Sequence, residues 1–162
     1  AQPVRLAAPV CVRADGSDSW GVALPADTTR LTVGLDFAAH AAIGRQWFSW
    51  APAAGTFGTE VAPARTFALE EHLKPMRARG LIRGASLECA LLCSRAGWVN
   101  GPLRFADEPA RHKLLDLLGD LALLGALPRA HVVASKASPR PHVQLAQALA
   151  AAHASSTLTA VG

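Results

Sequence analysis

The chain has 162 residues, of which 51% are hydrophobic and 17% are charged. That length fits one domain, and that composition is typical of a folded globular protein rather than a disordered one. Sixteen Lys and Arg against twelve Asp and Glu give a net charge of +4. Because the basic residues are scattered along the chain, we predict no nucleic-acid partner. Asp116 and Asp120 interrupt the most apolar stretch, so we expect no transmembrane segment.

The three cysteines, Cys11, Cys89 and Cys93, form no CxxC pair. An odd number without that spacing fits reduced thiols that serve as small apolar side chains. We therefore expect a soluble protein of a reducing compartment.

Residues 1–64 alternate short β-type runs with turn signals. Strands are predicted at 4–6, 9–13, 20–24 and 30–37, with a hairpin turn at 15–18. Within 30–37, Leu31, Val33, Leu35 and Phe37 alternate with other residues, as in a half-buried strand. An aromatic run at 47–50 predicts another strand, ended by a loop over 52–58. This half is predicted to be a small antiparallel sheet.

From residue 65 the apolar pattern lengthens to a helical one. A helix is predicted over 65–80, with Phe67, Leu69, Leu73 and Met76 on one face and Pro75 bending or shortening it. Buried strands are predicted at 87–93 and 130–135, with a loop or hairpin at 97–102. A leucine-rich helix should span 108–124 behind Asp107 as N-cap, and an Ala-rich helix 141–153.

This order of elements predicts an α+β fold in one domain over 1–153, strand-rich in 1–64 and helix-strand-helix-strand-helix in 65–153. The domain should have two layers, an antiparallel or mixed sheet with helices packed on one face, followed by a flexible tail at 154–162. The leucine face of the 108–124 helix is expected to cover a sheet containing both 87–93 and 130–135.

The best candidates for a chemical role are His112 and Asp116. On a helix these residues are one turn apart, with about 5–6 Å between their Cβ atoms. An imidazole nitrogen and a carboxylate oxygen on one face suit two positions of a tetrahedral zinc site. Lys113 could reach the same cleft from the side. The spacing alone is equally that of an exposed His–Asp ion pair.

Several segments surround this pair in a defined order: 65–67, 80–88, 103–108, 111–116, 119–121 and 131–136. In that order and spacing the chain resembles the UDP-3-O-acyl-N-acetylglucosamine deacetylase family, the zinc amidases that catalyse the committed step of the lipid A pathway. The resemblance covers nearly the whole chain, but only the C-terminal one of that family's two domains. Residues 97–105 look most similar to plant and algal members.

The resemblance implies roles for five residues. His112 and Asp116 match two of the three zinc ligands, and Lys113 matches a lysine of the active site. The Thr66 hydroxyl matches one that stabilises the tetrahedral oxyanion, and the Phe67 ring one that borders the substrate. The implied reaction is hydrolysis of the amide of a UDP-acyl-glucosamine-type substrate, with zinc polarising its carbonyl.

Two departures from the family pattern affect the activity that the resemblance implies. The third zinc histidine and the glutamate base belong to the family's N-terminal domain, and 1–162 holds no such segment. After Lys136, a candidate substrate contact, the family has a catalytic acid His where this chain has Pro139. His142 could replace it only through a local shift of three residues.

Three functions therefore remain open. The chain is the C-terminal half of a zinc-dependent deacetylase, incomplete or inactive alone, or a degenerate, non-catalytic structural subunit of a larger assembly. The third is binding of an acyl chain or nucleotide sugar without catalysis, in a cleft lined by Thr66 and Phe67. The expected partners are an N-terminal deacetylase-like domain or other protein subunits. The expected compartment is a mitochondrion or plastid for a plant or algal protein, and otherwise the bacterial cytoplasm.

Overall fold

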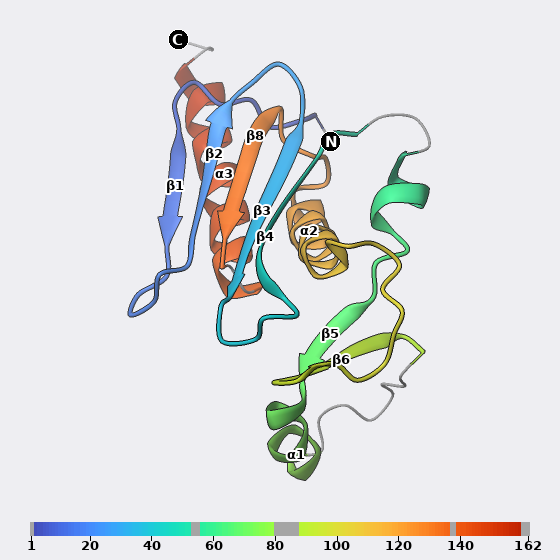
Figure 1. Ribbon diagram of the computed structural model, residues 1–162. Coiled ribbons are helices and arrows are strands. Elements are labelled where there is room, and N and C mark those ends of the chain that lie inside the picture. The colour runs from blue at the N-terminus through green and yellow to red at the C-terminus, as the bar shows by residue number, and fades with distance from the viewer. Residues whose placement is uncertain (1, 53–55, 80–87, 137–138, 160–162) are drawn as a thin grey trace.

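The computed structural model describes residues 2–52, 56–79, 88–136 and 139–159 (Figure 1). Its centre is a five-stranded mixed sheet in the order β1-β2-β8-β3-β4. The strands are β1 (Val10–Arg13), β2 (Trp20–Pro25), β3 (Arg30–Phe37), β4 (Gly44–Trp50) and β8 (Ala130–Ser135). The predicted strands of the first half are thus confirmed, except that 4–6 forms only an isolated bridge between Arg5 and Arg129.

The C-terminal strand β8 lies between β2 and β3, antiparallel to β2 and parallel to β3. The first half therefore does not form an antiparallel sheet by itself, because β2 and β3 each pair with β8 rather than with each other. Within this sheet, the β1–β2 and β3–β4 pairs are the ones formed by strands that are neighbours in the chain. In the turn between β1 and β2, Gly16 adopts a φ of 69°, the left-handed conformation that glycine tolerates best.

Two helices cover one face of this sheet, α2 (Glu108–Leu121) and α3 (Pro139–Thr159) (Figure 1). Leu114, Leu117 and Leu121 of α2 are fully buried and pack in one core with Leu31 and Val132 of the sheet. Each such burial contributes about 1.5–3 kcal/mol before entropy is subtracted. The predicted leucine face and the α+β class are confirmed.

A separate three-stranded sheet comes from β5 (Thr66–Leu69), β6 (Ala90–Ser94) and β7 (Gly97–Trp98), with α1 (Glu70–Ala78) after β5. The predicted helix over 65–80 is therefore wrong in its first part. Phe67 and Leu69 are two residues apart and both pack beside Ile43 and Cys93, as side chains on one face of a strand do. Pro75 is tolerated inside α1.

The expected strand at 87–93 appears as β6, but it pairs with β5 and β7 and not with β8. The leucine face of α2 thus covers only the sheet that contains β8, which corrects the expectation of a shared sheet. The physical reason is that β5, α1 and β6 form a parallel strand-helix-strand unit with its own pairing. The edge-on contact of Phe37 with Phe67, at 5.4 Å between ring centroids, joins this unit to β3.

Other expectations also need correction. Of the three cysteines only Cys93 is buried, whereas Cys11 and Cys89 are exposed. Helix α3 continues to Thr159, past the predicted end at 153, because its Ala-rich sequence contains no Gly or Pro there. Residues 53–55 and 80–87, which fall in the predicted loop and in one of the family-like segments, lie outside the described residues.

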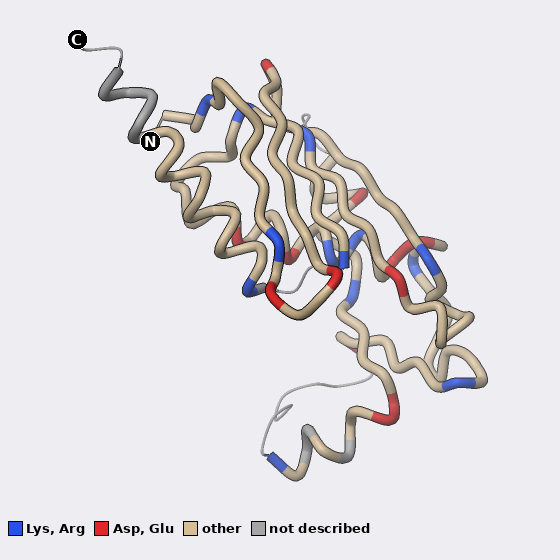
Figure 2. The backbone as a smooth tube through the Cα atoms, turned by 90° about the vertical axis from the view of Figure 1, so that its left-hand side faces the viewer, with Lys and Arg blue, Asp and Glu red and all other residues tan. Residues whose placement is uncertain are grey.

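No helix in the described part of the chain is long and apolar enough to span a membrane. Lys and Arg positions are interspersed with Asp and Glu positions along the backbone (Figure 2).

Candidate active site

Helix α2 brings His112 and Asp116 together as the spacing predicted. Their Nε2 and Oδ1 atoms are 3.4 Å apart. The other ring nitrogen, Nδ1, lies 3.1 Å from the carbonyl oxygen of Ala64. A carbonyl can only accept, so Nδ1 must carry a proton, and in the neutral ring Nε2 then presents its lone pair. This is the tautomer in which His112 can ligate a metal through Nε2, with a backbone carbonyl orienting the ring.

Lys113, the predicted active-site lysine, also contacts Asp116. Its Nζ donates to Oδ2 at 2.8 Å. The two oxygens of Asp116 therefore face His112 and Lys113, one each. The arrangement gathers an imidazole, an ammonium and a carboxylate on two turns of one helix.

Thr66 and Phe67 come from β5, which contacts α2. The exposed Thr66 follows directly on Ala64 and Arg65, and both of these residues bond to α2. The half-buried Phe67 packs edge-on against Phe37. Thr66 is thus two residues from the carbonyl that orients His112, while the ring of Phe67 belongs to the smaller apolar cluster.

His142 lies in the first turn of α3 and is 1% exposed. Its Nδ1 is 2.9 Å from Oδ2 of Asp120, one turn along α2 from Asp116. Its Nε2 is buried and has no hydrogen-bond partner among the described residues. Burial lowers the pKa of His142, and the Asp120 carboxylate opposes that shift. In a general acid–base histidine, one ring nitrogen bonds to a carboxylate and the other has no protein partner, and His142 has this arrangement.

Lys136, the predicted substrate contact, is held elsewhere. Its Nζ bonds to Oδ2 of Asp18 at 2.5 Å and to Oδ2 of Asp36 at 3.1 Å, and these bonds raise the pKa of Lys136. Its φ of 51° is left-handed, with its N–H donating to Gly34 and its carbonyl accepting from Ser19. These contacts tie Lys136 to the β1–β2 turn and to β3 rather than to the pair His112 and Asp116.

Sequence reasoning missed Glu108. Asp107 occupies the N-cap position, but its carboxylate accepts from Arg111 Nε at 2.7 Å and makes no cap. Glu108 beside it is completely buried and bonded to Arg65 and Arg104. The signal available in the sequence was an acidic residue at a helix start, within reach of several arginines.

His112 and Asp116 would fit as two of the three protein ligands that a catalytic zinc site normally has. His112 Nε2 and Asp116 Oδ1 are chemically suitable ligands. Among the residues that the structure describes, however, no three His, Cys, Asp or Glu side chains converge where they could hold a metal ion. A third protein ligand would have to come from elsewhere.

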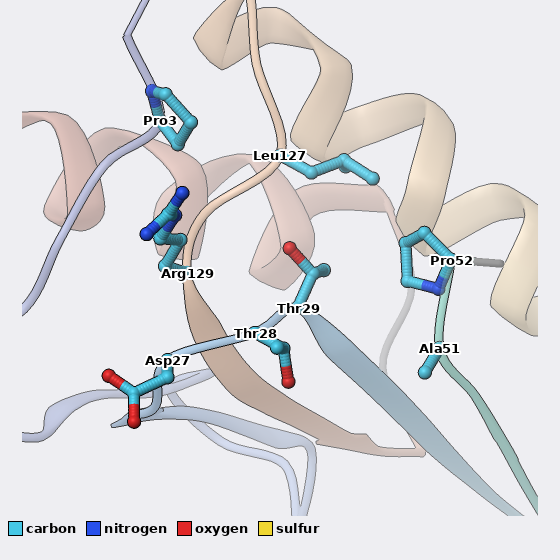
Figure 3. Close-up of a pocket in the computed structure, with 8 residues that line it drawn as sticks. All are labelled: Pro3, Asp27, Thr28, Thr29, Ala51, Pro52, Leu127 and Arg129. Atoms are coloured by element: carbon cyan, nitrogen blue, oxygen red, sulfur yellow. The ribbon is translucent and has the colours of Figure 1, made fainter.

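A separate hollow of about 500 Å³ opens at the end of the sheet where β3 and β8 begin (Figure 3). Its lining consists of Pro3, Asp27, Thr28, Thr29, Ala51, Pro52, Leu127 and Arg129. None of the predicted site residues belongs to it.

Comparison with known proteins gives the same family as the motifs. A sequence model described as UDP-3-O-acyl N-acetylglycosamine deacetylase matches residues 1–151. The UDP-3-O-acyl-N-acetylglucosamine deacetylase of Synechocystis sp. is 49% identical over 92% of this chain and 53% of its own length. The enzyme of that name from Thermosynechococcus vestitus is 61% identical over 79% of this chain and 44% of its own.

A plant relative is also similar. The "Probable UDP-3-O-acyl-N-acetylglucosamine deacetylase 1, mitochondrial" of Arabidopsis thaliana is 49% identical over 82% of this chain and 43% of its own length. The chain thus spans about half the length of the curated relatives it matches. Since the family model covers all but the last 11 of the 162 residues, the chain belongs to the UDP-3-O-acyl N-acetylglycosamine deacetylase family.

Proposed function

We propose that this chain contributes the C-terminal half of a zinc-dependent deacetylase that hydrolyses the amide of a UDP-acyl-glucosamine-type precursor in lipid A biosynthesis. The observation that carries the proposal is the orientation of His112. Its Nδ1 is held by the Ala64 carbonyl, which directs Nε2 toward the carboxylate of Asp116. Family membership and the half-length match to the relatives support the division into two halves.

His112 and Asp116 would hold the zinc, and polypeptide outside these 162 residues would supply the third ligand and the general base. Bound zinc would act as a Lewis acid toward the amide carbonyl. Lys113, which donates to Asp116, orients that carboxylate. The Thr66 hydroxyl is the candidate donor to the oxyanion, and the Phe67 ring the candidate apolar wall for the acyl chain.

His142 is the candidate proton donor to the leaving amine, in place of the family histidine that Pro139 replaces. Its support is the bond from Nδ1 to Asp120, which directs Nε2 away from that carboxylate. Nε2 is covered by this chain itself and burial favours the neutral ring, so the first turn of α3 would have to open for Nε2 to take up a proton from water and pass it to the leaving amine. A His142→Gln variant with unchanged turnover would remove this assignment.

A second function, a structural subunit without catalysis, rests on a different observation. Pro139 can neither donate a proton nor carry a charge, and Lys136, the candidate substrate contact, is committed to two carboxylates. The two functions differ in turnover, so one experiment separates them.

The experiment co-expresses this chain with the N-terminal half of the Thermosynechococcus vestitus relative. Zinc content is measured after dialysis, and amide hydrolysis is followed by release of the carboxylic acid. We expect about one zinc per complex and turnover that His112→Ala abolishes. The matched control is His131→Ala, because His131 bonds to Thr32 on the open face of the sheet. Zinc without turnover would support the structural subunit, and no zinc would overturn the metal assignment.

A further inference from the structure

The start of α2 holds a buried charge that the proposed chemistry does not use. Glu108 is 0% exposed, and its carboxylate accepts from four N–H groups. Oε1 accepts from the backbone N of Arg65 at 3.0 Å and from its Nε at 2.8 Å. Oε2 accepts from Arg65 Nη2 at 3.1 Å and from the backbone N of Arg104 at 2.6 Å. Such a fully bonded buried pair fixes its two backbone segments relative to each other.

The segment that Glu108 holds is the one that orients His112. Arg65 stands between Ala64, whose carbonyl bonds to Nδ1 of His112, and Thr66, the first residue of β5. Glu108 and His112 are four residues apart and share one face of α2. Helix α2 therefore bonds to residues 64–65 at two successive turns. Glu108 pairs with Arg65, and one turn later the His112 ring bonds to the carbonyl of Ala64.

A second pair of bonds joins residues 63–65 to the loop that precedes α2. Arg65 Nη2 also donates to the carbonyl of Pro102 at 2.8 Å, and Arg104 Nη1 donates to the carbonyl of Pro63 at 2.6 Å. The stretch 63–65 is thus tied to the loop before α2 as well as to α2 itself. These bonds set the position of the Ala64 carbonyl together with the bond from the Ala64 N–H to the carbonyl of Val61.

The ionisation of the pair is consistent with this arrangement. Burial by itself would raise the pKa of Glu108, but the bonds from the Arg65 side chain and from the backbone N–H groups of Arg65 and Arg104 outweigh it. The pKa of Glu108 is therefore held below its usual value. The same carboxylate raises the pKa of Arg65.

We propose that Glu108 is a positioning residue of the metal site: it holds Arg65 so that the neighbouring Ala64 carbonyl fixes the Nδ1–H tautomer of His112. Thr66 is aligned at the start of β5 by the same connection. The inference rests on the proposed metal role of His112, but its effect on the ring is present in the metal-free chain.

The test compares Glu108→Gln with Asp107→Asn, the adjacent carboxylate that bonds to Arg111 instead. Nitrogen-15 NMR of the metal-free chain reports which ring nitrogen of His112 is protonated. In the neutral ring we expect Nδ1–H in the wild type and in Asp107→Asn, and a mixture of both tautomers in Glu108→Gln. In the zinc-loaded complex with the complementing half, Glu108→Gln should weaken zinc affinity roughly 10–100-fold.

A folded Glu108→Gln chain with the wild-type His112 tautomer would overturn the inference. If that variant does not fold, Arg65→Lys takes its place, because it retains the charge and the backbone N–H but loses the Nε and Nη2 bonds. A wild-type tautomer in folded Arg65→Lys would also overturn it. Absence of zinc from the wild-type complex would instead overturn the proposed function, and the tautomer result decides the inference separately.

Discussion

Asp120 of α2 and His142 of α3 are 22 residues apart in the chain, and their Oδ2 and Nδ1 atoms lie 2.9 Å apart. The bond joins the two helices that cover the sheet, at a position where the imidazole is otherwise enclosed. Charging a buried imidazole costs free energy because the protein replaces its hydration, and one carboxylate compensates only in part.

The stability of the fold should therefore depend on pH through His142. Its pKa is lowered from the ordinary value of about 6.5. Between the two pKa values the unfolded chain binds more protons than the folded one, so the free energy of unfolding falls as pH drops. We expect urea denaturation to show lower stability at about pH 5.5 than at about pH 7.5, with a shallower slope in His142→Gln. An unchanged slope in that variant would assign the dependence to other groups.

A buried leucine of α2 and an exposed one beyond its end offer a matched pair of substitutions. Leu117 is 0% exposed in the main core, whereas Leu123, just beyond the helix, is 71% exposed. Leu117→Ala should lower the free energy of unfolding by about 2–5 kcal/mol, because it removes buried methyl groups and leaves a cavity. Leu123→Ala should change it by less than about 0.5 kcal/mol. Equal losses in urea titrations would mean that the covered face has been assigned to the wrong residues.

On the open face of the sheet, Trp47 of β4 lies across Gly34 of β3. A Cβ added at Gly34 would meet ring carbons of Trp47 at 2.7 Å, closer than real contacts allow. Gly34→Ala should therefore displace the exposed end of the ring and lower stability, by about 1 kcal/mol or less. The displacement is measurable as a change in tryptophan fluorescence, because the ring of Trp47, which is 56% exposed, would lose its contact with Gly34.

Two variants control that experiment. Gly58→Ala meets nothing within 4 Å and should leave stability nearly unchanged. Adding Trp47→Leu to Gly34→Ala removes the obstructing ring and should recover most of the lost stability. Failure to recover would show that the cost at Gly34 comes from its backbone rather than from the ring.

Elements with a local signal were predictable from the sequence. The alternation of Leu31, Val33 and Leu35 reflects one buried face of β3, and the leucines of α2 repeat with the helical period. By contrast, the place of β8 between β2 and β3 depends on pairing between residues about 100 positions apart, such as Thr32 with Val133. No local pattern encodes such a partner. The helix expected over 65–80 failed for a related reason, because β5 exists through its pairing with β6.

The candidate site divides in the same way. His112 and Asp116 were found because both lie on one helix at a spacing with a chemical meaning. Glu108 was missed because its partner, Arg65, is 43 residues away, and because Asp107 matched the usual N-cap preference. The carbonyl that orients His112 belongs to an alanine, whose side chain gives no chemical signal.

The isolated chain should neither retain zinc through dialysis nor hydrolyse the amide substrate. With His112 and Asp116 as its only protein ligands here, zinc would complete its shell with water, whereas catalytic sites normally use three protein ligands. The general base of the proposed mechanism is also outside these residues, and such a base typically contributes about 10²–10⁴-fold. Metal analysis and an acid-release assay on the purified chain measure both expectations. One tightly held zinc per chain, with turnover lost in His112→Ala and in His142→Gln, would contradict them and would assign the acid to His142.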